Sequence, residues 1–502
     1  MRHRAWALVS RRDNTPRPRA FGVHSRVPSL LSRAREVSSG YFVLRKDAAN
    51  DLGRDAMMGT FHAPPGPKGH LLGGNVREYA RDPLGFLSRC VREYGDVVEL
   101  RFMGQRIYLL SDPGLIQYIL VENNRNFTKT RILKRNRRLL GEGLLTSEGE
   151  FWRRQRRLAQ PAFHRRRIAA YGEVIAAFAE RSLQAWRDGQ TIDVHEEMMH
   201  LTLEIVAKCL FDADVGARAT DVGRAMKVAL ENFSTQRRLI RIPKSIPTPH
   251  NIRFEMAARR LDDVVGTIIE NRRKSKEDWG DLLSMLMLAE DESGERMTDK
   301  QLRDEVMTLF LAGHETTANA LSWTFWLLSS NPKVEHELVE ELERVLGGRP
   351  PTISDLPDLP FAERIVKESM RLYPPAWVVG REATAECEVG GYRMAAGTTA
   401  LMSQWVMHRD PHYYDDPQRF DPDRWIARYE EVLPRFAYFP FGGGPRQCIG
   451  ASFAMTEARL ILATVAQRFE MKLAPGQRVE PYPSITLRPK KGIRMTLVER
   501  SH

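Results

Sequence analysis

The chain has 502 residues, of which 42% are hydrophobic, and its formal net charge is +12. This length suits either two average domains or one large domain with a deep interior. The basic charge excludes little by itself, but no nucleic-acid motif occurs, so it indicates a membrane surface or an acidic protein partner. The cysteines lie too far apart for a disulfide framework or a zinc site, and a reducing, cytoplasmic setting is expected: Cys90, Cys209, Cys387 and Cys448.

The N-terminal extension, residues 1–60, is rich in arginine and serine and has weak periodicity. The stiff segment Ala63-Pro-Pro-Gly-Pro-Lys-Gly69 follows it. The extension contains no apolar run long enough for a membrane anchor or a signal peptide. It could be a disordered tail, a transit peptide or an over-long translation start, with the real start at Met57 or Met58. Acidic residues argue against the transit peptide: Asp47, Asp51 and Asp55.

The body of the chain, residues 61–502, is expected to form one mainly α catalytic domain with small β-sheets, of the α+β class. Strands are predicted as a hairpin over 97–111, around a Gly-Gly turn within 387–394, and between 484 and 498, where the last hairpin is expected. Residues 239–251 carry Pro243, Pro247 and Pro249 and are predicted to form a lid-like loop. Helical periodicity covers most of the rest: 173–186, 198–210, 221–237, 254–273 and 300–328.

The basic segment Phe151-Trp-Arg-Arg-Gln-Arg-Arg157 places Trp152 and Arg156 one helical turn apart. Both side chains can therefore reach the same ligand. An amphipathic, arginine-rich surface helix is the simpler interpretation, and we keep it for Arg153, Arg154 and Arg157.

A long helix capped by Thr298 or Asp299 is predicted to be central, because it is apolar on nearly every face. A membrane span is the alternative, but Glu315 near its middle argues against it. His-Glu-x-x-His zinc chemistry fails, because position 318 is alanine. Glu315 beside Thr316 is suited to proton transfer, whereas a threonine bonded back into its own helix describes Thr317 better.

Two further motifs lie toward the C-terminus. Glu368 and Arg371 are three residues apart on one helical face, a common pattern that gains weight only from its context. The loop Phe441-Gly-Gly-Gly-Pro-Arg-Gln-Cys-Ile-Gly450 sets a thiol before an apolar helix, where backbone amides can stabilise a thiolate that binds a metal. Arg446 adds a charge suited to a carboxylate of a cofactor.

This loop resembles the heme-binding signature of the cytochromes P450, matched by Phe441, Gly444, Arg446, Cys448 and Gly450. Residues 312–317 resemble the oxygen-binding groove of that family, and the other motifs follow in the family's order from residue 60 onward. The resemblance implies the cytochrome P450 fold and heme b, with Cys448 as the axial ligand of the iron. It also implies heme-propionate contacts from Trp152, Arg156, Arg381 and Arg446, and a buried triad: Glu368, Arg371 and Arg419.

The resemblance further implies a monooxygenase that uses O2 and two electrons from a ferredoxin or flavodoxin with its NAD(P)H-dependent reductase. Glu315 and Thr316 would deliver protons, and the basic residues beside Arg156 would dock the acidic electron donor. A monomer without a membrane anchor and a small apolar substrate, such as a fatty acid, terpene or steroid, are expected. A heme-thiolate isomerase, dehydratase or peroxygenase, and a non-catalytic heme protein, are the alternatives. The pocket would be lined by Leu309, Ala312, Ala376, Trp377, Val378 and Ile485.

Overall fold

A computed structural model describes residues 63–71, 73–134, 136–214, 219–235, 247–275, 280–290 and 294–500. The expected extension over residues 1–60 and most of the expected lid lie outside these ranges. The predicted C-terminal limit of the lid, residue 251, is wrong, because Pro249 already begins helix α11 (Pro249–Ser275). Proline is tolerated in the first helical turn, where its missing N–H has no partner to lose.

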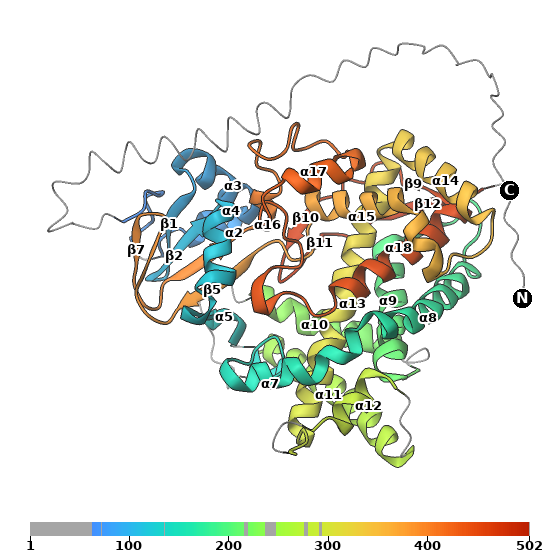
Figure 1. Ribbon diagram of the computed structural model, residues 1–502, viewed down its shortest axis with the longest axis horizontal. Helices are drawn as coiled ribbons and strands as arrows, with labels where there is room; N and C mark the ends of the chain where they lie inside the picture. The colour runs from blue at the N-terminus through green and yellow to red at the C-terminus, as the bar shows by residue number, and fades with distance from the viewer. Residues whose placement is uncertain are drawn as a thin grey trace, which may run out of the picture. The chain divides into compact units, whose positions relative to one another are not determined.

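The described body is mainly α-helical, as predicted, and Figure 1 shows β1, β2, β5 and β7 at one end, with β9 and β12 among the long helices toward the other. The predicted helices are confirmed in α8, α9, α10, α11 and α13. The helices are α2 Val76–Arg81, α3 Pro83–Tyr94, α4 Pro113–Gln117, α5 Arg131–Lys134, α6 Arg137–Leu140, α7 Gly149–Ala159, α8 Arg165–Leu183, α9 Val194–Phe211, α10 Ala219–Thr235, α12 Leu282–Leu288, α13 Asp299–Ser329, α14 Pro332–Leu346, α15 Pro360–Leu372, α16 Gln404–Met407, α17 Ala427–Val432 and α18 Ala451–Arg468.

The largest sheet has the strand order β1-β2-β8-β5-β3, with β2 and β8 parallel. It confirms the predicted hairpin as β1 and β2. The second predicted turn is confirmed as the hairpin of β6 (Cys387–Val389) and β7 (Tyr392–Met394). The strands of the large sheet are β1 Val97–Phe102, β2 Gln105–Leu110, β3 Phe127–Lys129, β5 Val379–Ala383 and β8 Thr399–Met402.

The predicted last hairpin, between residues 484 and 498, is wrong in its pairing. β11 (Leu487–Pro489) pairs with the preceding β10 (Pro481–Pro483). β12 (Arg494–Glu499) instead joins β9 (Phe469–Leu473) and the distant β4 (Thr191–Asp193). Local patterning finds strands, but it does not say which of them pair.

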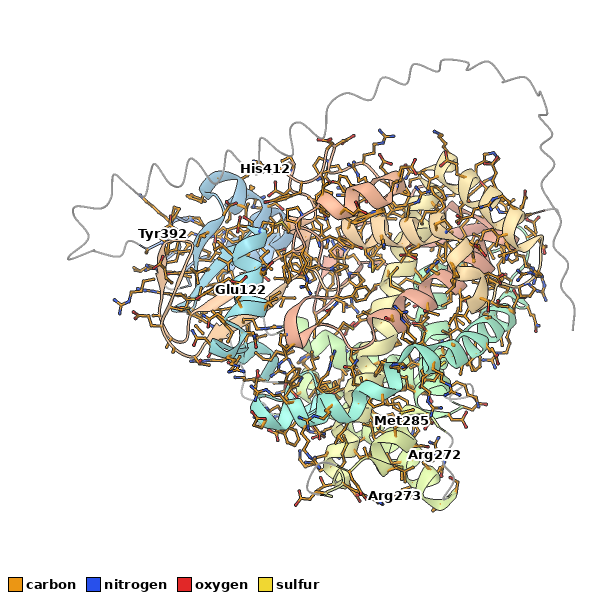
Figure 2. The ribbon with its side chains drawn as sticks, in the orientation of Figure 1. Glu122, Arg272, Arg273, Met285, Tyr392 and His412 are labelled. Atoms are coloured by element: carbon orange, nitrogen blue, oxygen red, sulfur yellow. The ribbon has the colours of Figure 1, made fainter. Side chains whose placement is uncertain are left out.

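Helix α13 is the central element, and it packs against α9, α18 and α15 (Figure 1). It begins with a capping box, in which Thr298 accepts from the Gln301 amide and the Gln301 side chain accepts from the Thr298 amide. Most of its residues are buried, and the buried residues occupy every face of the helix. Below it, Arg272 of α11, labelled in Figure 2, donates to Asp281 at 2.7 Å and ties α11 to α12.

Candidate functional site

The cysteine loop turns sharply before α18. The Cys448 amide donates to the Phe441 carbonyl at 3.0 Å, which folds the loop back on itself. Gly444 has a φ of +67°, and a Cβ there would lie 1.8 Å from the Leu120 carbonyl oxygen. No other residue type fits this position without moving the backbone. The turn leaves Cys448 three residues before Ala451, where α18 begins.

The Cys448 side chain is exposed, yet the protein around it desolvates the thiol and raises its pKa. The Gly450 amide and the positive charge of Arg156 act in the opposite direction and favour the thiolate. Accessibility and desolvation occur together when a side chain lies on the wall of a recess inside the protein. A ligand in that recess could therefore reach the sulfur.

Helix α7 meets this loop through Arg156 and Trp152. Arg156 donates to the Gln447 carbonyl at 3.0 Å. The Arg446 guanidinium lies 3.9 Å from the centre of the Trp152 ring, and it forms an ion pair with Glu148. Trp152, Arg156 and Arg446 thus come from two distant segments and form one cluster beside Cys448.

Two strands of the large sheet complete the cluster. Lys129 of β3 lies opposite Arg381 of β5, and both side chains are buried. Burial and the charge of Arg446 lower the pKa of Arg381 to about 10, and burial with Arg381 and Arg446 lowers the pKa of Lys129 well below its ordinary value. Glu148 is the carboxylate that opposes these shifts. The cluster thus holds four basic side chains, Arg156, Arg446, Lys129 and Arg381, against one acid, Glu148, so it can bind a further negatively charged group.

Lys129 was missed by the sequence analysis. It belongs to no motif, and its signal is only a lysine at the end of the short Phe-Thr-Lys strand. Its neighbour across the sheet, Arg381, lies about 250 residues away along the chain. Only the strand pairing brings the two together.

Ala312 lies in the predicted groove of α13 and is exposed, whereas most of the neighbouring residues in this helix are buried. Thr316, one turn later, donates its hydroxyl to the Ala312 carbonyl at 3.0 Å. The sequence analysis assigned such a bond to Thr317, which is wrong. Thr317 lies on the α18 side of the helix, where its hydroxyl faces the carboxyl of Glu457.

Glu315 points away from the groove and toward the hairpin formed by β10 and β11. Its carboxylate accepts from the Thr486 hydroxyl at 3.0 Å, and it is 3% exposed. Desolvation raises its pKa, while Arg488 and Thr486 act in the opposite direction. Glu315 and Thr316 are therefore neighbours in sequence with different surroundings.

The Glu368–Arg371 pair is a buried, two-contact ion pair with nitrogen–oxygen distances of 2.9 and 2.8 Å. Arg371 also donates to the backbone carbonyls of His408, Pro417 and Arg419. Both side chains are 0% exposed. The pair thus holds the long segment between β8 and the cysteine loop against α15.

The third member of this network is Arg424, so the predicted role of the Arg419 side chain is wrong. Arg419 offers only its carbonyl, and its side chain is 67% exposed. Arg424 Nε lies 3.4 Å from Glu368, and Trp425 donates to the same carboxylate at 3.0 Å. The sequence contains Pro-x-Arg-aromatic twice, at 417–420 and 422–425, and the 3-10 turn Pro422–Trp425 directs the second copy inward.

The predicted pocket residues divide into two groups. Trp377 is 1% exposed and donates to the Ser484 carbonyl at 3.1 Å, so it packs in the core beside the sheet and does not line an open space. Leu309 is likewise buried, at 7%. Accessible surface remains on the others: Ala312, Ala376, Val378 and Ile485.

This helical fold, with a thiol in a recess beside a basic cluster, is that of a heme-thiolate protein. The model of the cytochrome P450 family matches residues 64–497, and the chain belongs to that family. The protein is a heme b monooxygenase that acts on an apolar organic substrate with O2 and electrons from a redox partner. Among the described helices, none combines the length and apolar character that crossing a bilayer requires.

Three comparisons illustrate the relationship. Cyclooctatin synthase of Streptomyces melanosporofaciens is 40% identical over 84% of this chain and 92% of the relative. Pentalenene oxygenase of Streptomyces avermitilis is 36% identical over 88% of this chain and 98% of the relative. The solved heme domain of cytochrome P450DA is 28% identical, with a TM-score of 0.80 over 88% of this chain and 98% of that one.

Proposed function

We propose that this protein oxygenates a cyclic terpene and takes electrons from a ferredoxin or flavodoxin served by an NAD(P)H-dependent reductase. Two relatives support the substrate class, namely pentalenene oxygenase and cyclooctat-9-en-7-ol 5-monooxygenase. The side chains that keep accessible surface at the expected pocket are apolar, which suits such a ligand: Ala312, Ala376, Val378 and Ile485.

The observation that carries the proposal is the Cys448 thiol, which is accessible although the surrounding protein desolvates it, beside the basic cluster. Cys448 would bind the heme iron, with Phe441 holding the loop in shape through its carbonyl. The residues around it fit the rest of heme b, whose two propionates would supply the negative charge that the neighbouring cations call for. Those carboxylates would be held by Trp152, Arg156, Arg381, Arg446 and Lys129.

The bound heme would supply oxygen activation at a thiolate-ligated iron. Thr316 would offer its hydroxyl to the groove by rotating away from the Ala312 carbonyl, a bond it can break and re-form. Glu315, whose pKa burial raises, holds its proton more readily than an ordinary carboxyl, and it would deliver that proton to the groove after turning away from the Thr486 hydroxyl. The two residues would thus act in sequence as an acid and a hydrogen-bond donor.

Electrons would enter near the cysteine loop. An open depression of about 1040 Å³ lies between Pro445 of that loop and a set of basic side chains: Arg153, Arg156, Arg157, Arg165, Arg166 and Arg167. This charge suits an acidic electron donor. Arg154, which the sequence analysis placed on the same surface, does not line the depression and donates to the Glu295 carbonyl at 3.0 Å.

The test is spectroscopic. Reduced protein under carbon monoxide should show the absorption typical of thiolate-ligated heme, and Cys448→Ala should abolish it. Cyclic terpenes should shift the Soret band of the ferric protein at lower concentration than fatty acids or steroids. A Cys448→Ala protein with the thiolate-type spectrum would refute the ligand assignment. Full turnover with hydrogen peroxide alone, without NADH and a redox partner, would favour a peroxygenase.

A further inference from the structure

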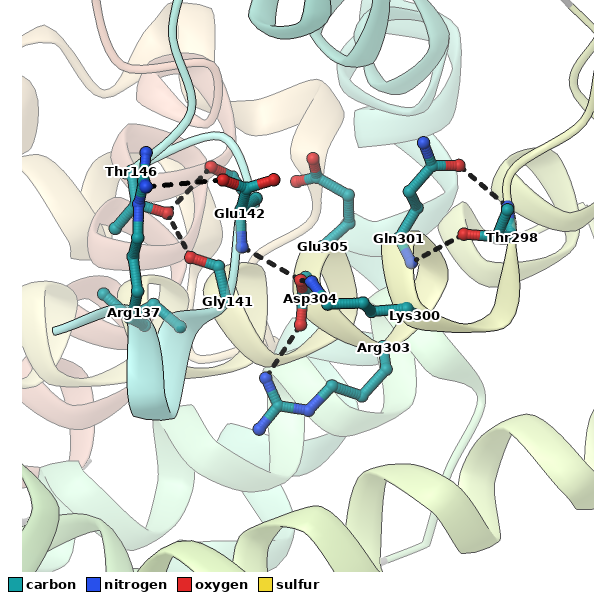
Figure 3. A network of polar contacts seen from close by, with 12 residues as sticks. Arg137, Gly141, Glu142, Thr146, Thr298, Lys300, Gln301, Arg303, Asp304 and Glu305 are labelled. Atoms are coloured by element: carbon teal, nitrogen blue, oxygen red, sulfur yellow. Dashed lines mark hydrogen bonds and ion pairs between the residues drawn. The ribbon is translucent and has the colours of Figure 1, made fainter. Parts of the chain in front are cut away.

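The loop between α6 and α7, residues 141–148, is held by two successive acids of α13, and Figure 3 shows the contact of the first, Asp304, with Glu142. Asp304 accepts from the Glu142 amide at 2.9 Å, and Glu305 accepts from the Leu144 amide at 2.9 Å. The Thr146 hydroxyl donates to the Gly141 carbonyl at 2.7 Å and closes the loop. The helix therefore binds alternate backbone amides of one short segment.

The loop lies directly on the helix surface. A Cβ on Gly141 would meet the Asp304 carboxylate at 1.9 Å, and one on Gly143 would meet the Thr308 hydroxyl at 2.2 Å. Gly141 also has a φ of +54°. Glycine at these positions permits the close approach that the two hydrogen bonds require.

The far end of the same loop reaches the cluster beside Cys448. The Ser147 carbonyl accepts from Arg446 at 2.8 Å, and Glu148 forms the ion pair with Arg446. The next residue, Gly149, begins α7, which carries Trp152 and Arg156. The loop thus joins the acids of α13 to three members of that cluster.

Glu305 also contacts α7 itself. Gln155, which is 0% exposed and precedes Arg156, donates to the Glu305 carboxylate at 3.2 Å. Asp304 is balanced by Lys300 at 2.8 Å and Arg303 at 2.9 Å, whereas the donors to Glu305 are a backbone amide and a side-chain amide. Burying a carboxylate against neutral donors lowers the stability of the folded protein. We therefore expect Glu305 to have a role other than stabilising the fold.

We propose that Asp304 and Glu305 are positioning residues for the heme: they fix loop 141–148 and α7 so that Arg446, Trp152 and Arg156 meet its carboxylates. The inference rests on the proposed heme contacts of those residues. Partners that orient the groups holding a cofactor typically change its affinity by roughly 10- to 100-fold when they are replaced.

The experiment measures the transfer of heme from the ferric holoprotein to excess apomyoglobin. Glu305→Gln places an amide N–H opposite the Gln155 N–H, and it should speed release roughly 10-fold or more. The double variant Glu305→Gln, Gln155→Glu restores one donor facing one acceptor and should return the rate toward that of the wild type. A merely structural effect would not be reversed by this exchange.

The matched control is Glu341→Gln, because Glu341 is also buried and accepts two backbone amides, those of Phe361 and Ala362, at 2.8 and 2.9 Å. Its release rate should match the wild type. If Glu305→Gln does not load heme, Gln155→Met, which keeps Glu305 and removes its side-chain donor together with the acceptor of Arg154, should still speed release. Arg156→Gln tests the proposed heme contact itself. Fast release from Arg156→Gln with wild-type release from Glu305→Gln or Gln155→Met would overturn this inference alone.

Discussion

Thr316 and Thr317 occupy successive positions of α13, but only Thr316 points along the groove that Ala312 opens. Thr316→Ala should keep heme and substrate binding and should divert electrons into hydrogen peroxide. One positioned proton-transfer group contributes about 10²–10⁴-fold, enough to uncouple oxygen consumption from product formation. The measurement is the yield of product and of peroxide per NADH.

Thr317→Ala is the matched control, because its hydroxyl faces Glu457 and not the groove. It should leave the product yield per NADH unchanged. Equal yields from Thr316→Ala and the wild type would remove Thr316 from the proton pathway.

Arg419 and Arg424 offer a second comparison between single residues. Arg424→Ala leaves Glu368 buried with one cation fewer and should lower the free energy of unfolding by roughly 3 kcal/mol. Arg419→Ala removes an exposed side chain and should change it by less than about 0.5 kcal/mol. Denaturant unfolding of the two holoproteins checks the ranking, and a larger loss in Arg419→Ala would show that the network uses the first Pro-x-Arg copy.

Motif spacing predicted the residues that come together in the cysteine loop and on α7, because each spacing lies within one turn or one loop. Motif spacing failed where contacts between distant segments decide which residue joins the site. Arg424 is selected over Arg419 by the inward turn after Pro422, and Lys129 joins Arg381 only through the pairing of β3 with β5. Side-chain direction also escaped it, as Trp377 shows by pointing at the Ser484 carbonyl.

At the scale of elements, α7 presents different residues on its two sides. Gln155 faces α13, while Arg153 and Arg157 line the depression beside the cysteine loop. Helical periodicity predicted α8, α9, α10, α11 and α13, whereas α7 was inferred from the one-turn spacing of Trp152 and Arg156. The C-terminal strands were harder, because β12 pairs with β4 some 300 residues earlier.

Neutralising Arg153 and Arg157 to glutamine should slow reduction by the electron donor about 10-fold at low salt and weaken its salt dependence. These charges act on encounter with the partner, so substrate-induced shifts of the Soret band should stay the same. Arg154→Gln is the control, since Arg154 donates to the Glu295 carbonyl away from the depression. The same loss of reduction rate in the control variant would place the docking surface elsewhere.

For the whole molecule, Glu457 is a buried acid that links stability to pH. It lies on α18 and is 0% exposed, with Thr317 of α13 facing it and Cys209 of α9 near enough for its charge to act on that thiol. Burial raises the pKa of Glu457 from 4.5 to about 8, and Thr317 opposes the shift. The carboxyl is therefore neutral in the folded protein at pH 7 and ionised in the unfolded chain.

This difference sets the sign of a pH dependence. Between pH 4.5 and about 8 the folded protein binds more protons at Glu457 than the unfolded chain, so this residue makes stability fall as pH rises. Below that window Glu457 does not affect the free energy of unfolding, and above it the loss is complete and amounts to roughly 5 kcal/mol. Glu457→Gln cannot ionise and should lack this slope.

The measurement compares the free energy of unfolding of the wild type and Glu457→Gln, both loaded with heme, at pH 5, 7 and 9. The free energy of unfolding of Glu457→Gln should rise relative to that of the wild type at each higher pH. The reason is that ionisation of the buried carboxyl destabilises only the protein that contains Glu457. Glu480→Gln, which replaces an exposed acid paired with Lys490, should follow the wild-type slope above pH 5. A constant difference between Glu457→Gln and the wild type over this range would mean that Glu457 is already ionised in the folded protein.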